Sequence, residues 1–178
     1  MITDLPSPIS VSVLMFVFGL LPFFVVMATA FAKISIVLML LRNALGVQQA
    51  PSGLVLNSIA LTLTAFITFP LAVSIIDGLE ASRSDLSSVE GMKQSYGVIS
   101  EQVSAHLQKH AFEREIDFFK AAAYKLWPPT LHGYITDDSL LILLPSHIVS
   151  EITRAFEISF LLFLPFVVVD LIVSNILL

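Results

Sequence analysis

Two long runs of the chain carry no charged residue, one at residues 5–32 and the other at residues 43–76. A soluble amphipathic helix places polar residues on its exposed face every three or four positions, and neither run does so. Each run is longer than the roughly 20 apolar residues that a helix needs to cross a bilayer. The pattern predicts an N-terminal hydrophobic helical hairpin over residues 1–76, with segments at about residues 8–41 and 52–76.

Prolines interrupt these apolar segments. Pro22 lies in the first segment, Pro70 in the last third of the second, and Pro165 in a later apolar stretch. A proline removes one hydrogen bond within a helix, so we expect a break or a bend at each, and above all at Pro22. Between the first two segments, Gly46 fits a helix C-cap and Pro51 fits the start of the next helix.

A third apolar stretch, residues 140–178, is long enough to span a membrane but carries Glu151, Arg154, Glu157 and Asp170. A charged side chain at the centre of a bilayer costs roughly 2.5 to 3.5 kcal/mol, so this stretch cannot face lipid on all sides. The first three charges follow at steps of three residues, so Arg154 can meet either acid, or a charge on a neighbouring subunit. The alternative is that the charges lie at the membrane surface and reach water.

The region between the second and third hydrophobic segments, residues 77–139, is rich in charge and predicts an exposed helical domain. Ser87 and Glu90 fit a capping box, and a single amphipathic helix is expected to end by Trp127, because Pro128 cannot continue it. Its apolar stripe must pack on a neighbouring subunit or on the membrane helices, and the sequence does not choose between these. The stripe consists of Met92, Tyr96, Ile99, Val103 and Leu107.

The orientation of the chain follows from the basic residues beside the apolar segments. The short connection at residues 43–51 follows Arg42, which indicates the cytoplasmic side. The exposed domain at residues 77–139 is then expected in the periplasm, because long loops cross the membrane largely regardless of their charge.

Composition supports the membrane interpretation and excludes other classes. Of 178 residues, 56% are hydrophobic and only 13% charged, and the mean hydropathy is +0.90. These values predict an all-α membrane protein built from kinked helical hairpins. The net charge of −5 and the lack of a basic cluster argue against binding to nucleic acid. With no cysteine, the chain has neither disulfides nor thiolate ligands for metals.

The histidines offer little sign of catalysis. His106 and His110 are spaced to share one helix face, but the glutamate of a zinc-protease motif does not stand between them, and a solvated face is the simpler interpretation. His132 and His147 are interpreted as loop or helix-start residues. Neither a glycine-rich phosphate loop nor a nucleophile elbow occurs in the sequence, so we expect no enzyme, no cofactor and no metal.

Two blocks of sequence resemble a known family: LPFFVVMATAFAKISIVLMLLRNALGVQQAP at residues 21–51 and LLPSHIVSEITRAFEISFLLFLPFVVVDLIVSNILL at residues 143–178. Both resemble the FliP/SctR family, the core export-gate membrane subunits of type III secretion systems, in content, order and spacing. LWPP at residues 126–129 and DDSLLILLP at residues 137–145 look more like the virulence injectisome branch than the flagellar branch.

The resemblance implies a multi-pass protein of the bacterial inner membrane. It implies five copies in a ring that joins two smaller export-apparatus membrane subunits, forming an entry portal for unfolded protein substrates within the lipid bilayer. Charged residues at such positions in similar proteins lie at subunit contacts, so Glu151 and Arg154 are expected to pair between neighbouring subunits. The full set of expected assembly residues is Lys33, Glu151, Arg154, Glu157 and Asp170.

The sequence departs from the family at its end. Family members usually continue past the equivalent of Leu178 with a methionine-rich turn and a fourth apolar segment, so the methionine gasket is not assigned to any residue here. We expect either a truncated product or a naturally shortened member. The alternative function is a small-solute or ion transporter, suggested by proline-interrupted helices and intramembrane charges, although the sequence has no inverted repeat.

Overall fold

The computed structural model of the chain describes residues 8–47, 50–82 and 89–177. The regular structure of these residues is entirely helical, which confirms the all-α class. The elements in chain order are α1 (Pro8–Ala28), α2 (Phe31–Ala44), α3 (Gly53–Ser82), α4 (Val89–His110), α5 (Glu113–Leu126), the 3-10 helix η1 (Pro129–Tyr134) and α6 (Leu140–Leu177).

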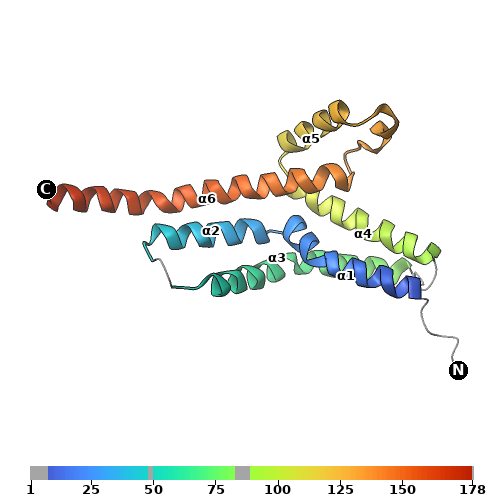
Figure 1. Cartoon of the computed structure of the whole chain (residues 1–178), viewed down its shortest axis with the longest axis horizontal. Helices are drawn as coiled ribbons and strands as arrows, with labels where there is room; N and C mark the ends of the chain where they lie inside the picture. Colours follow the sequence, from blue (N-terminus) through green and yellow to red (C-terminus); the bar gives the residue numbers. More distant parts are fainter. Residues whose placement is uncertain (1–7, 48–49, 83–88, 178) are drawn as a thin grey trace, which may run out of the picture.

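The longest helix, α6, is the axis of the molecule (Figure 1). Helices α1, α2, α4 and α5 pack directly against it, and α3 packs against α2 and α4. Helix α5 and η1 lie on the opposite side of α6 from α1, α2 and α3, and the C-terminal part of α6 projects beyond the other helices (Figure 1). The N-terminal half of α6 is therefore the part around which the chain is organised.

The first apolar run forms two helices, because α1 ends at Ala28 and α2 begins at Phe31. The end of α1 and the whole of α2 are bent by 76° relative to each other. At the bend, the Thr29 hydroxyl donates to the carbonyl of Val25 and accepts from the N–H of Phe31. Such local side-chain bonds offer the backbone an alternative to the helical ladder, and this places the bend at Thr29.

The break expected at Pro22 is therefore wrong, since α1 continues through this residue. Helix α3 likewise continues through Pro70, and α6 through Pro145 and Pro165. A proline removes one hydrogen bond of a long helix while the bonds on either side remain, so the helix survives it. A bend at these prolines stays a prediction.

The connection from α2 to α3 follows the expected hairpin. Gly46 has a φ of 68°, which residues with a Cβ adopt at a cost, and its N–H donates to the carbonyl of Asn43 at 3.1 Å. These features confirm Gly46 as the residue that ends α2. Between the two helices, the Ser35 hydroxyl donates to the Asn57 side-chain oxygen at 3.3 Å.

Helix α3 is longer than the second segment predicted from the sequence, because it continues through Asp77 to Ser82. Only Leu56, Ala60 and Thr64 of this helix are buried, and they form one narrow stripe at every fourth position. Most of the α3 surface is therefore not covered by the rest of the chain. The division of the chain at residues 76 and 139 stays a prediction.

The amphipathic helix expected before Trp127 is two helices, so the prediction of one helix is wrong. Helix α4 ends at His110 and α5 begins at Glu113, since the backbone N–H of Phe112 bonds the Ser150 hydroxyl of α6 at 2.8 Å. Tertiary contact thus overrides the helical period. The end of α5 at Leu126 agrees with the expected stop before the two prolines, and the expected cap at Ser87 lies outside the described residues.

The apolar stripe of α4 is divided between two environments. Leu107 is fully buried and Val103 packs against the main core, whereas Met92, Tyr96 and Ile99 are exposed. The N-terminal half of α4 turns its small residues, including Ser95, toward the rest of the chain. The main core lies between α4, α5 and the start of α6, and its buried members are Ala28, Leu107, Ile116, Ala123, Ile135, Ile142 and Leu143.

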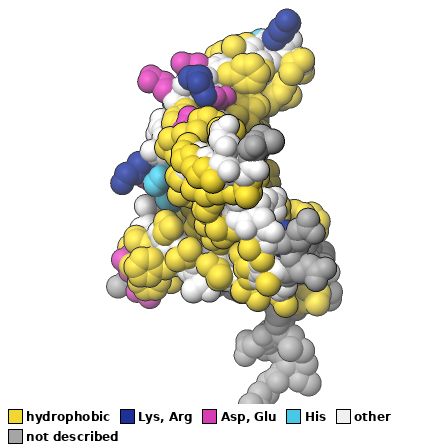
Figure 2. Space-filling view, turned by 90° about the vertical axis from the view of Figure 1, so that its left-hand side faces the viewer, with side chains coloured by type: hydrophobic (Ala, Val, Ile, Leu, Met, Phe, Trp, Pro, Cys, Tyr) yellow, Lys and Arg dark blue, Asp and Glu magenta, His cyan; other side chains and the backbone are white. Residues whose placement is uncertain are grey.

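The distribution of apolar surface fits a membrane protein. In the described residues, α3 and α6 are each long and apolar enough to cross a bilayer, and the bent pair of α1 and α2 could form a third span. Within the described part of α6, no side chain beyond Ser159 is buried. Figure 2 shows this end of the molecule as a largely hydrophobic face with few charges.

Two glycines offer a matched test of how closely α3 and α4 pack. A Cβ at Gly78 of α3 would lie 2.7 Å from Val98 Cγ1 of α4, whereas a Cβ at Gly97 would meet nothing within 4 Å. Gly97→Ala should stabilise the protein by about 0.5–1 kcal/mol through helix propensity. Gly78→Ala should lose that gain and be less stable than Gly97→Ala by about 1 kcal/mol, because the Val98 side chain is stiff.

The measurement is the thermal unfolding midpoint of each variant in one detergent. Equal midpoints for the two alanine variants would contradict the close approach of the helices at Gly78.

Candidate functional site

Glu151 lies at the centre of a buried ion cluster. Glu151 is only 1% exposed, although its side chain is a carboxylate. Lys33 Nζ of α2 lies 2.9 Å from Glu151 Oε2, and Arg154 Nη1 lies 2.9 Å from Oε1. The two cations are about one-quarter exposed, so they reach both the carboxylate and the surface. A buried carboxylate is tolerated only when it is paired in this way.

Arg154 extends the cluster to the end of α4. The same Nη1 atom donates to the backbone carbonyl of His110, a carbonyl left free because the helix ends there. The guanidinium carbon lies 4.2 Å from the centre of the Phe112 ring, in cation–π contact. Arg154 therefore holds the turn between α4 and α5 against α6.

Serine hydroxyls of α6 also bond the turn between α4 and α5. Ser150 accepts the N–H of Phe112, and Ser146 donates to the carbonyl of Glu115 at 3.3 Å. Earlier in α4, the Ser104 hydroxyl donates to the carbonyl of Asp138 at 2.8 Å, in the connection that leads into α6. Serine is small enough for the helices to approach closely while these backbone groups remain bonded.

Three histidines lie beside the ion cluster. The ring centres of His106 and His110 are 4.4 Å apart, and the His147 ring centre is 6.3 Å and 6.5 Å from them. The expectation of a solvated face for His106 and His110 is wrong, because both are partly buried against α6. His147 is neither a loop nor a helix-start residue, since it lies inside α6 and is 2% exposed.

Burial lowers the pKa of His106 from its usual value, and the nearby His110 acts in the same direction. Lys109 also lowers it, while Glu151 opposes the change. The setting of His106 therefore favours its neutral form. The fourth histidine, His132, lies apart in η1, where its Nε2 is 3.0 Å from the Trp127 carbonyl.

The remaining predicted assembly residues lie away from the cluster. Glu157 and Asp170 are both exposed on α6, and Pro165 lies between them. The predicted pairing of Glu151 with Arg154 occurs within one chain, since both carboxylate oxygens have cations of the same chain beside them. Lys33 of the same chain is a second cation beside Glu151. The expected pairing of Glu151 and Arg154 between neighbouring subunits stays a prediction.

The arrangement is suited to holding helices together. The carboxylate is enclosed and balanced by cations on both sides, so it is poorly placed to accept a proton from a substrate. In the described residues, no group of three or more His, Asp or Glu side chains is placed to hold a metal ion. The cluster links α2, α4 and α6 through Lys33, the His110 carbonyl and Glu151.

Sequence reasoning named Lys33, Glu151 and Arg154 as assembly residues, but it did not pair Lys33 with Glu151. The roles of Phe112, Ser146 and Ser150 had no sequence signal, because they depend on where α4 ends.

Comparison with known proteins bears directly on this arrangement. The model of the FliP family matches residues 14–178, which include every residue of the cluster. The chain belongs to the FliP family. The family resemblance of the two sequence blocks is thereby confirmed.

Individual relatives extend over most of the chain. The "Yop proteins translocation protein R" of Yersinia pestis is 40% identical over 98% of this chain and 81% of its own length. The "Probable translocation protein y4yL" of Sinorhizobium fredii is 43% identical, covering 89% of this chain and 72% of the relative. The "Virulence protein YscR" of Salmonella typhimurium is 35% identical, covering 97% and 80% respectively. These relatives agree with the injectisome branch rather than the flagellar one.

Loss of the buried carboxylate should destabilise the fold. In Glu151→Gln, Lys33 and Arg154 lose their shared anion, and we expect a loss of about 2–4 kcal/mol in the free energy of unfolding. In Lys33→Met, Arg154 still balances the carboxylate, so the loss should be about half as large. Thermal or denaturant unfolding in detergent measures both.

Glu157→Gln is the matched control, because Glu157 is an exposed carboxylate on the same helix and should change stability by less than about 0.5 kcal/mol. If Glu151→Gln were as stable as Glu157→Gln, the buried cluster would not hold the helices together.

Proposed function

We propose that this chain is a core membrane subunit of a type III secretion export apparatus. In this proposal, five copies join two smaller membrane subunits in the bacterial inner membrane to form an entry portal for unfolded proteins. The membership in the FliP family supports it, as do the names of relatives that are translocation and virulence proteins. We expect passage of substrates without catalysis by this chain.

The observation that carries the proposal is the amount of apolar helix surface that one chain leaves uncovered. Phe16, Phe23, Phe66, Phe160 and Ile176 are each at least 64% exposed, and they lie on α1, α3 and α6. Lipid can cover part of such surface, and neighbouring subunits can cover the rest. Exposed Glu157 and Asp170 on α6 are then candidates for contacts between subunits, together with the exposed edges of Lys33 and Arg154.

The ion cluster also bears on the rival function. A transporter of ions or small solutes needs intramembrane charges that are accessible to a solute. Here the most deeply buried charge, Glu151, is held by two cations of the same chain. This arrangement favours a structural role over a solute site.

The mass of the assembly distinguishes the two functions. The chain, expressed with the other export-apparatus subunits and purified in mild detergent, should give five copies per complex by native mass spectrometry. Glu157→Gln and Asp170→Asn together should lower the yield of this complex several-fold, because they remove the exposed acids of α6. A monomer or dimer in every preparation would favour a transporter.

Secretion provides the functional test. Deletion of the gene in its own bacterium should abolish release of type III substrates into the medium, and the wild-type gene should restore it. Glu151→Gln should restore it poorly, because the subunit is less stable. Normal secretion in the deletion strain would contradict the proposed function.

The predicted orientation has its own test. Alkaline phosphatase inserted between the exposed Asp137 and Asp138 should be active, because the region of α4 and α5 is proposed to lie in the periplasm. The same enzyme inserted after Gly46 should be inactive. The reverse pattern would reverse the topology.

A further inference from the structure

The three histidines at the junction of α4 and α6 have an unusual setting. His106 and His110 come from the last turns of α4, and His147 comes from α6, with ring centres 4.4 to 6.5 Å apart. They occupy the place where α4, α6 and the bend after α1 meet. No part of the proposed export function uses them.

His147 is the most constrained of the three. It is 2% exposed, and neither ring nitrogen has a hydrogen-bond partner of good geometry within the described residues. The backbone of Thr29, at the bend after α1, lies beside the His147 ring. A neutral ring tolerates this apolar setting, whereas an imidazolium needs acceptors or an anion for its charge.

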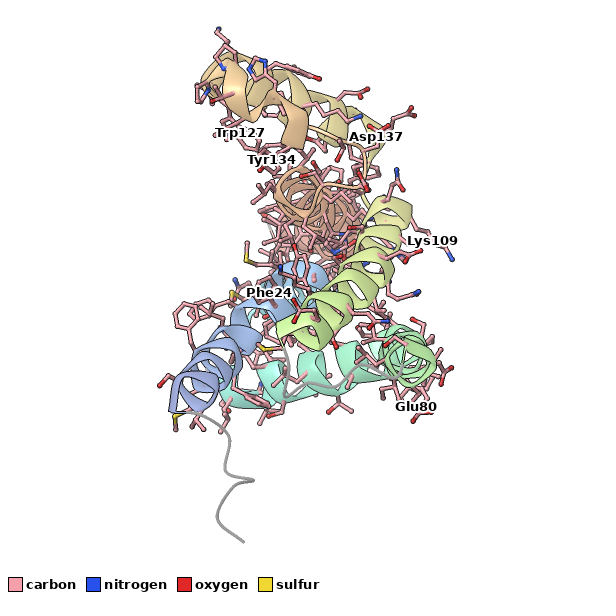
Figure 3. All side chains as sticks on the ribbon, turned by 90° about the vertical axis from the view of Figure 1, so that its right-hand side faces the viewer. Phe24, Glu80, Lys109, Trp127, Tyr134 and Asp137 are labelled. Carbon is pink, nitrogen blue, oxygen red and sulfur yellow. The ribbon has the colours of Figure 1, made fainter. Side chains whose placement is uncertain are left out.

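The charged groups around the rings make a further positive charge there electrostatically unfavourable. Helix α2 contributes Lys33, and α6 contributes Glu151 and Arg154, so two cations already share one anion. Helix α4 adds Lys109, which Figure 3 shows on its outer side, pointing away from α6. Helix α1 has no charged residue, and on α5 the Arg114 and Glu115 side chains pair with each other. Among the described residues, the anion near the rings is Glu151, and it is already paired with two cations.

We propose that the His106–His110–His147 cluster makes the junction of α4 with α6 sensitive to acid, so that protonation of the rings weakens the packing of α4 on α6. When uncharged, the rings pack against one another. In acid, they add positive charges beside Lys33 and Arg154, and these repel one another in a poorly hydrated space. The property belongs to the fold and does not depend on the export function.

The direction of the effect follows from linkage. A histidine whose pKa is lower in the folded protein than in the unfolded chain binds fewer protons when folded. Its neutral form stabilises the fold above the usual histidine pKa of about 6.5, and this stability is lost progressively as the pH falls from that value through the lower pKa of the folded protein. The lowered pKa of His106 has this sign.

Acid would act on the contacts that hold α4 to α6. The Arg154 bond to the His110 carbonyl and the Ser104 bond to the Asp138 carbonyl both join α4 to α6 or to the segment leading into it. The Phe112 contact with Ser150 lies directly after the cluster. Weaker packing at this junction would release α5 and η1 from α6, while α2 and α3 would keep their contacts with each other.

The test uses the full chain in detergent, with thermal unfolding followed by circular dichroism at about pH 7.5 and about pH 5.5. The midpoint of the wild type should fall by about 3 °C or more between the two values. The quantity compared is this fall, so a uniform loss of stability in a variant does not affect it. In His106→Gln with His147→Gln, the fall should be at most half that of the wild type.

His132→Gln is the matched control, because His132 lies in η1 outside the cluster, and it should keep the wild-type fall. His106→Gln alone is the fallback if the double variant does not fold, since its ring is only partly buried, and it should also reduce the fall. The proposal is overturned if the wild type has no fall, if the cluster variants keep all of it, or if His132→Gln removes as much.

Discussion

The buried carboxylate of Glu151 is the constraint on which the packing of this chain depends. A carboxylate with 1% exposure loses nearly all its hydration, so cations must lie where they can reach it. Lys33 comes from α2 and Arg154 from α6, and Arg154 also bonds the end of α4. One buried carboxylate and its two cations thus link three helices, α2, α4 and α6.

The two halves of α6 on either side of this cluster differ in how much of their surface is buried. Its N-terminal half carries buried serines, Ala155 and the cluster, and it is covered by the other helices. Its C-terminal half, like most of α3, presents large apolar side chains outward. Hydrophobic burial therefore explains only part of the stability of a single chain, and the remaining surface depends on lipid and on other subunits.

The sequence predicted the elements better than their ends. Uncharged runs identified the apolar helices, and Gly46 identified the end of α2, because both signals are local. The first apolar run breaks at Thr29 and not at Pro22, which the sequence favours because a proline is a strong local signal and a back-bonding threonine a weak one. The end of α4 at His110 depends on Ser150, a residue distant in sequence, so the helical period of the stripe could not reveal it. The pairing of Lys33 with Glu151 could not be predicted for the same reason, because spacing along one helix indicates Arg154 but cannot show which residue of another helix lies beside the carboxylate.

The uninterrupted length of α6 has a mechanical consequence. From Glu151 to Leu177 the helix extends for about 39 Å at 1.5 Å per residue, and it continues through Pro165 without a break. With the ion cluster as the pivot, a tilt of α6 would displace its far end. By simple geometry, a tilt of about 10° at the pivot would move the far tip by about 7 Å, more than the pitch of one helical turn. Small changes among the charges at one end would therefore displace the other end by more than one helical turn.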